Sequence, residues 1–266
     1  MRILIRTSKW AIWARRFGSL AVPLTVIPVF LHRERLISSA DFTVVEIVAL
    51  AVAGLGLFLA LGAFARLWVT GDQGWGKATI GFFLSLVCLA PFAFTLMQMT
   101  LYPAVSDVST DPARPPGLVS QIETRPLTIA ARDAIEAAFP NARSRTYPIE
   151  AAQMFALVES LVDERGWEPR ARREPQTPLA EGQYNAVATT LVGWRDEVAI
   201  RVQGTAQGSS VAMRSASLQP GHDQGENGRR IEEFLSALDD RVTSLLRSAP
   251  VLPEIDPDDL VQPEED

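Results

Sequence analysis

Two long apolar segments dominate the first hundred residues of the chain. Residues 44–65 and 78–99 each reach the length of about 20 apolar residues with which a helix crosses a bilayer. A shorter apolar segment, 17–31, precedes them and contains two prolines. Its length also fits the hydrophobic region of a cleaved signal peptide. The charged run that follows it favours a short membrane span instead, so we expect three spans, at about 15–32, 44–65 and 78–99.

Small residues recur along one side of the second apolar segment, at Ala49, Ala53, Gly56 and Ala60. Such residues let the backbones of neighbouring membrane helices approach closely, so this side is expected to contact the other helices. Pro91 interrupts the hydrogen-bond ladder of the third segment and predicts a kink there.

Beyond residue 100 the pattern changes to short periodic segments separated by polar intervals. A tether at 101–126 is rich in proline and in turn-forming residues. Helices are expected at 127–138 and 148–165, and strands at 167–173, 183–192, 197–203 and 210–218. Four strands without regular βαβ alternation predict an α+β domain over 127–248. Its expected form is an antiparallel sheet of about four strands with helices on one face.

The last strand and the long helix after it form the most informative part of the sequence. Apolar residues alternate with others through 211–217, as in a strand with one buried face, and they recur at helical spacing over 231–246. Between these segments, Asp223 and Glu226 have the spacing of a capping box, in which the aspartate accepts from the first helical turn and the glutamate reaches back. Polar residues gather at this turn, so any site in the soluble half is expected here.

The turn at 205–208 predicts the pairing of the last two strands. Paired residues should have numbers that sum to about 413, which places Ile200 opposite Met213 in the core and leaves Arg201 and Arg214 on the open face. Two arginines this close repel each other unless protein carboxylates or an anionic ligand intervene. Carboxylate partners would favour a plain ion-pair role. The candidate ligand-binding residues are Arg201, Arg214, Ser215, Ser217, Asn227 and Arg230.

Charge divides the chain into a basic apolar half and an acidic polar half. Residues 1–100 carry nine basic and four acidic side chains, whereas residues 101–266 carry sixteen basic and twenty-seven acidic ones, within a net charge of −6. This division is typical of a membrane anchor joined to a soluble domain. The last residues, 249–266, are acidic and rich in proline, which predicts a disordered tail.

The basic residues also predict the orientation in the membrane. With three spans, most of those flanking the spans lie on one side, and the positive-inside rule places that side in the cytoplasm. They are Arg2, Arg6, Lys9, Arg15, Arg16, Arg66 and Lys77, against Arg33 and Arg35 on the other side. We therefore expect a protein of the bacterial inner membrane with a cytoplasmic N-terminus and a periplasmic or otherwise extracytoplasmic soluble domain.

The expected partners are the lipid bilayer and, for the domain, an envelope protein or an anionic ligand. An acidic domain repels the phosphates of nucleic acid, so no nucleic acid is expected. One cysteine and two histidines, without a nucleotide-binding fingerprint, predict no metal and no cofactor. The alternative is a hydrolase or transferase that uses His222 and Asp223, although no nucleophile motif accompanies them. A concave pocket holding His222 and a second titratable group would favour that alternative.

Three stretches resemble the family of proteins with the domain of unknown function numbered 1499. They are the tether YPAVSDVSTDPARPP, the strand pair TTLVGWRDEVAIRV and the last unit VAMRSASLQPGHDQGENGRRIEEFLSAL. The resemblance covers about Tyr102–Leu246, and bacterial members often combine apolar spans, such a tether and this domain. Where the family commonly has Arg-x-Gly, this chain has Gln219, Pro220 and Gly221, so a basic residue is missing. The resemblance implies no activity, because none is assigned to the family.

Overall fold

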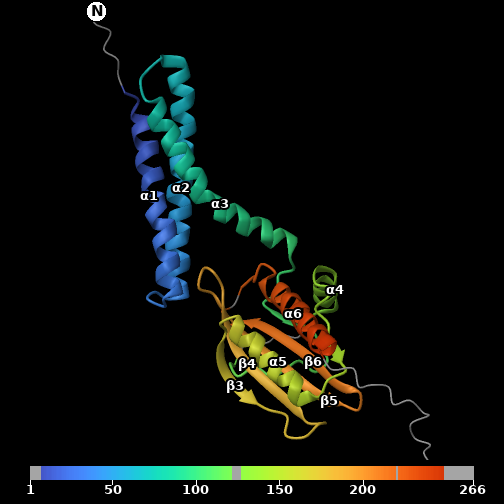
Figure 1. Ribbon diagram of the computed structural model, residues 1–266. Coiled ribbons are helices and arrows are strands. Elements are labelled where there is room, and N and C mark those ends of the chain that lie inside the picture. The colour runs from blue at the N-terminus through green and yellow to red at the C-terminus, as the bar shows by residue number, and fades with distance from the viewer. Residues whose placement is uncertain (1–6, 122–126, 220, 249–266) are drawn as a thin grey trace, which may run out of the picture.

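A computed structural model of the chain describes residues 7–121, 127–219 and 221–248, and it consists of an N-terminal helical bundle followed by a sheet domain (Figure 1). The tail expected at 249–266 lies outside the described residues, as does the end of the tether at 122–126.

The bundle contains the three long apolar helices that the hydropathy pattern predicts. They are α1 (Lys9–Arg33), α2 (Ser39–Thr70) and α3 (Trp75–Leu101), and each is long and apolar enough to cross a membrane. The second helix begins at a side-chain cap, in which the Ser38 hydroxyl accepts from the amide of Asp41. Prolines lie inside α1 and α3 without ending either helix.

Small residues hold the bundle together, as expected. Ala49, Ala53, Gly56 and Ala60 are all buried in α2. The backbones of α1 and α3 approach closely, since a Cβ atom on Gly81 would lie 2.5 Å from the backbone carbon of Ala14, so only glycine fits. Part of the way along, α3 bends away from α1 and α2 and runs towards the sheet domain (Figure 1). This helix contains Pro91, and the bend agrees with the predicted kink.

The two ends of the bundle have different neighbours. Thr7 forms an isolated bridge with Gln73, so the start of α1 lies at the same end as the connection from α2 to α3. The sheet domain contacts the other end, where Glu168 forms ion pairs with Arg35 of the α1–α2 turn and with Arg195. The α1–α2 turn and the domain therefore share one end, as three consecutive spans require.

The sheet has six strands in the described residues rather than about four. Two unexpected strands, β1 (Asp107–Ser109) and β2 (Arg145–Tyr147), pair with the edge of the last strand. Each has three residues, too few to show a period of two, and β1 lies in the expected tether. The four expected strands form an antiparallel meander: β3 (Glu168–Arg173), β4 (Glu181–Thr189), β5 (Arg195–Thr205) and β6 (Gly208–Ser217).

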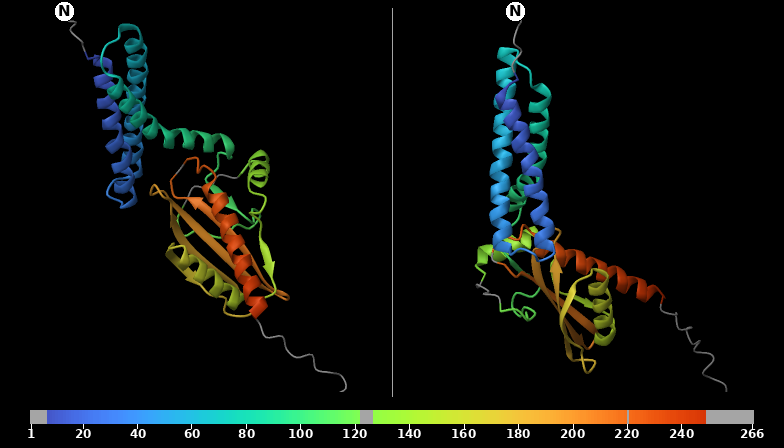
Figure 2. Two further views of the ribbon diagram at one scale, coloured as in Figure 1. Left: turned by 45° about the horizontal axis from the view of Figure 1, so that its top comes forward. Right: turned by 90° about the vertical axis from the view of Figure 1, so that its left-hand side faces the viewer.

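The predicted register between β5 and β6 is confirmed. Ile200 lies opposite Met213 and Arg201 opposite Ala212. The helices α5 (Ala151–Glu164) and α6 (Glu226–Ser248) cover the face on which Ile200 and Met213 lie (Figure 2). Their apolar stripes and this face form one core, which includes Met154, Val158, Phe234, Leu235 and Leu238. The short helix α4 (Ile129–Ala138) stands apart from this layer and has no buried residue.

Candidate functional site

The face of the sheet opposite α5 and α6 is covered around Glu197, Arg201 and Arg214, which are all buried. Residues 110–121, which we call the strap, run across it. Arg201 is 5% exposed and Arg214 is 9% exposed, so the expectation that they face solvent is wrong. Burying a guanidinium is costly unless it is paired, and the strap and β1 supply the partners.

Each of the two buried arginines has a carboxylate and a backbone carbonyl from the strap region. The two nitrogens Nε and Nη2 of Arg214 donate to the two oxygens of Asp107, at 2.9 and 2.6 Å. Arg201 donates to Asp111 at 2.6 Å and to the carbonyl of Arg114 at 2.7 Å. The first pair is the two-pronged arginine–carboxylate geometry, which fixes orientation as well as charge. Asp107 and Asp111 are thus the acids that neutralise the two arginines on neighbouring strands.

A buried glutamate holds the other end of the strap. Glu197 on β5 is fully buried, and its carboxylate accepts from the amides of Val119 and Ser120 at 2.5 and 2.9 Å. Asn185 of β4 donates to the same carboxylate and to the carbonyl of Gly117. Burial raises the pKa of Glu197, but the hydrogen bonds from Ser120, Val119 and Asn185 outweigh it, so the pKa lies below its ordinary value.

A second polar cluster lies on the opposite face of the sheet, under the start of α6. Arg230 donates to Asp196 at 2.7 Å and also to Ser215 and Asn227 at 2.9 and 3.0 Å. Asn227 in turn donates to Ser217. Arg230 is 7% exposed and Asp196 is 3% exposed, so this cluster is closed to solvent. It joins the first turn of α6 to the ends of β5 and β6.

The six candidate residues therefore do not form one site. Arg201 and Arg214 lie under the strap, whereas Ser215, Ser217, Asn227 and Arg230 lie under α6, on the other side of the sheet. The period of two along β6 already separates neighbours such as Arg214 and Ser215. Asp107 and Asp111 are the partners that sequence reasoning did not identify, whereas Asp196 was a possible arginine partner from the sequence and pairs with Arg230. Asp107 and Asp111 lie in the segment expected as a tether, and only the fold brings them to the two arginines.

The turn before α6 holds its polar side chains in backbone contacts. The carboxylate of Asp223 accepts from the amides of Gly225 and Asn227 at 2.9 and 3.1 Å. Burial raises the pKa of Asp223 despite these bonds. Glu226 does not complete the expected capping box, because its carboxylate contacts Arg229 and Arg230 instead.

His222 also belongs to this turn, and both of its ring nitrogens face backbone atoms. Nδ1 accepts from the amide of Gln224 at 2.9 Å, and Nε2 lies 3.3 Å from the carbonyl oxygen of Met99, at the end of α3. These contacts tie the turn to the bundle, and His222 is not among the residues that line the hollow described next. Within the described residues, no three His, Cys, Asp or Glu side chains gather as a metal site would require.

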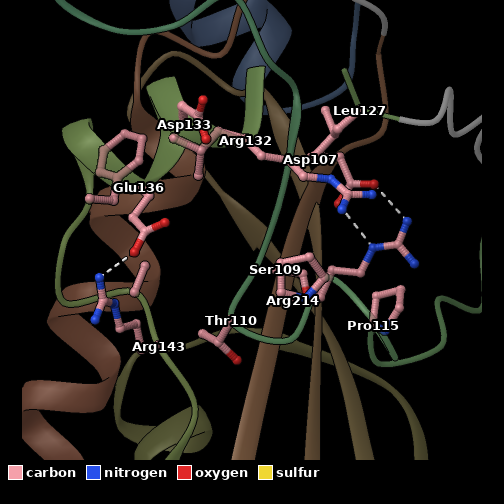
Figure 3. A pocket seen from close by; sticks show the side chains of 14 residues that line it. Asp107, Ser109, Thr110, Pro115, Leu127, Arg132, Asp133, Glu136, Arg143 and Arg214 are labelled. Atoms are coloured by element: carbon pink, nitrogen blue, oxygen red, sulfur yellow. Dashed lines mark hydrogen bonds and ion pairs between the residues drawn. The ribbon is translucent and has the colours of Figure 1, made fainter. Parts of the chain in front are cut away.

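A hollow of about 610 Å³ lies between the strap and α4, and we call it the groove (Figure 3). Its walls are mostly apolar, from Pro112, Pro115, Leu127, Ile135 and Phe139. This volume is in the range of pockets that bind small molecules. The groove also adjoins the bundle, because Phe139 stacks on Tyr102, the residue that follows α3, with the rings 5.5 Å apart.

Charged side chains surround the apolar walls of the groove. Arg214 pairs with Asp107, and Arg143 pairs with Glu136. Arg132 of α4 also lines the groove, and it forms no ion pair with any described residue. In Figure 3 the Arg132 side chain extends across the groove, whereas the carboxylate of Asp133 points away from it. Arg214 is the one candidate residue from the sequence that lines this hollow.

Comparison with known proteins gives a family for the sheet domain. No curated protein matches the chain. No solved structure matches it either. Residues 107–238 match the model of a family described as "Protein of unknown function (DUF1499)", and these residues run from β1 into α6. The resemblance found in the tether, the strand pair and the last unit is thereby confirmed: the sheet domain of this chain belongs to the DUF1499 family.

Proposed function

We propose that this protein is a membrane-anchored binding protein of the cell envelope, whose domain takes up an amphipathic ligand beside the membrane surface. The observation that carries this proposal is the groove, with its apolar walls and its place next to the end of α3. An apolar ligand body fits these walls, and Arg132 offers a partner for an anionic head group. The contacts of His222 and Asp223 with the backbone favour binding over a hydrolase or transferase reaction.

The proposed location of the domain is outside the cytoplasm, in the periplasm of a bacterium. Lys9 and Lys77 lie near the end of the bundle opposite the sheet domain, which is the arrangement expected from the positive-inside rule. A reporter enzyme that is active only in the periplasm, fused after Leu246, should therefore be active. Activity of a cytoplasm-only reporter at the same position would refute the proposed orientation.

Binding in the groove can be tested with a photoreactive lipid. The full chain is placed in vesicles of phosphatidylethanolamine and phosphatidylglycerol with palmitic acid that carries a diazirine, and labelled peptides are identified by mass spectrometry after irradiation. The peptide that contains Phe139 and Ala142 should be labelled together with the three apolar helices. Ala142→Trp fills the groove and should abolish labelling of this peptide without changing the labelling of the apolar helices. Leu179→Trp, at an exposed position that does not line the groove, should leave the labelling of the groove peptide and of the helices unchanged.

The head group can be tested with the same vesicles. Arg132→Gln should reduce labelling of the groove by the fatty acid about fivefold, equivalent to about 1 kcal/mol, because one exposed charge pair is lost. Labelling by the corresponding fatty alcohol, which has no charge, should not change. If the groove peptide stays unlabelled while the apolar helices are labelled, the binding proposal is wrong.

A further inference from the structure

The turn between β4 and β5 has an unusual composition for its position. Its residues are Thr190–Trp194, and Leu191 at the tip is 84% exposed, with Val192 36% exposed beside it. Hairpin turns are normally built from glycine and small polar residues. Here Gly193 supplies the left-handed backbone, with φ of 93°, while Leu191 is almost fully uncovered and Val192 is partly covered.

Contacts with the bundle determine where this turn lies. Nδ1 of His32 donates to the carbonyl of Val192 at 2.7 Å, since a carbonyl can only accept. The ring of Trp194 packs edge-on against His32 and Phe42, with ring centres 5.0 and 5.8 Å apart. A Cβ atom on Gly193 would lie 2.9 Å from the backbone of Arg33, so the approach is as close as glycine allows. The turn is thus attached to the end of α1 and the start of α2.

Several observations place the β4–β5 turn at the level where the apolar helices α1 and α2 meet. Figures 1 and 2 show the β4–β5 turn beside the domain-side end of α1 and α2. That end also carries Leu36, which is 70% exposed in the α1–α2 turn. Arg33 ends α1, Arg35 lies in the α1–α2 turn, and Arg195 begins β5 directly after the β4–β5 turn. Exposed aliphatic side chains, a tryptophan and arginines at the end of membrane spans are the composition of a bilayer interface.

We propose that the β4–β5 turn inserts Leu191 and Val192 into the lipid leaflet on the side of the sheet domain. The proposal rests on the membrane anchoring proposed above and adds a second attachment of the domain to the lipid. Insertion removes the two aliphatic side chains from water, which is favourable in proportion to the apolar area covered. Trp194 then lies at the head-group level, and the exposed guanidinium of Arg33, which contacts the carbonyl of Leu191, faces lipid phosphates. Arg35 and Arg195 remain paired with Glu168. The domain is held at a fixed orientation against the membrane.

Depth-sensitive fluorescence on the full chain tests this inference. Cys88 is the single cysteine and is replaced by alanine. New cysteines at Leu191, Leu179 and Phe58 are then labelled one at a time with a polarity-sensitive dye. Leu179 is the matched control, because it is 63% exposed and its carbonyl accepts from Gln203, near the far end of β5. Phe58 is 64% exposed in the middle of α2 and reports on the bilayer.

The labelled proteins are measured in vesicles of phosphatidylethanolamine and phosphatidylglycerol, with iodide as the aqueous quencher and brominated lipid as the membrane quencher. If the turn is inserted in lipid, the emission at position 191 should be blue-shifted, quenched by brominated lipid and protected from iodide. Position 58 should behave likewise, whereas position 179 should be quenched by iodide alone.

Other patterns separate the alternatives. If position 58 is quenched by lipid but position 191 behaves like position 179, the turn is in water and the inference fails while the anchoring stands. Protection from both quenchers at position 191 would mean that a protein surface covers the turn, which also overturns insertion into lipid. If iodide quenches position 58 as well, the membrane anchoring is wrong and the inference falls with it.

Discussion

Replacement of Arg230 by methionine should lower the free energy of unfolding of the sheet domain by about 3–5 kcal/mol, because it leaves a buried carboxylate unpaired. Asp196 is 3% exposed, and Arg230 is its one ion-pair partner among the described residues. Ser215 and Asn227 lose a donor in the same substitution. Urea unfolding of the full chain in detergent micelles, followed by near-ultraviolet circular dichroism, measures the loss.

A second substitution shows whether the unpaired charge is the cause. Asp196→Leu combined with Arg230→Met replaces the pair by apolar side chains and should recover most of the lost stability. Arg241→Met is the matched control, since Arg241 pairs with Glu164 at the surface and should cost no more than about 1 kcal/mol. If Arg230→Met were equally mild, the cluster would not support the fold, and its arginine would be available for the anionic ligand first suggested by the sequence.

Replacement of Glu197 by alanine should release the strap. The amides of Val119 and Ser120 lose a charged acceptor, and such hydrogen bonds together are worth about 3 kcal/mol. Hydrogen exchange in the peptide 107–121 should then be about 100-fold faster, since about 1.4 kcal/mol corresponds to a factor of ten. Glu159→Ala, which removes a carboxylate that pairs with Arg172 away from the strap, should leave this exchange unchanged.

The contribution of Glu197 should also depend on pH. Because the pKa of Glu197 is lowered in the folded domain, its stabilisation is complete above the ordinary pKa of 4.5 and is lost as the pH falls through the lowered value. Burial raises the pKa of Asp111, but the Arg114 amide and the Arg201 guanidinium lower it further, so the pKa lies below its ordinary value. The stabilisation from Asp111 therefore depends on pH in the same direction as that from Glu197. The difference in urea midpoint between the native chain and Glu197→Ala should therefore be largest at neutral pH and shrink below pH 4.5. A difference that grows towards acid would contradict the strap contacts.

Elements with strong periodicity are predictable from the amino-acid sequence alone. The two long apolar runs and the shorter one before them predicted three helices, because a backbone in an apolar surrounding must satisfy its polar groups internally. The alternation in β5 and β6, with a short turn between them, was enough to predict the register that pairs Ile200 with Met213. A one-residue shift would have turned every core side chain outwards, so burial selects one register. The strands of the β4–β5 hairpin were expected at 183–192 and 197–203, but β4 ends at Thr189, so Leu191 and Val192 lie in the turn.

What covers the second face of the sheet, and which charges pair there, depends on contacts between distant parts of the chain. β1 and β2 are three residues long, and their place is set by the free edge of β6 rather than by their own pattern. Asp111 finds Arg201 across 90 residues of sequence, and Asp107 finds Arg214 across 107. Such partners leave no local signal, because the cost of burying a guanidinium is met by whichever acid the folded chain brings near it. Alternation showed that Arg201 and Arg214 face away from the core, but it could not show that the strap lies above them.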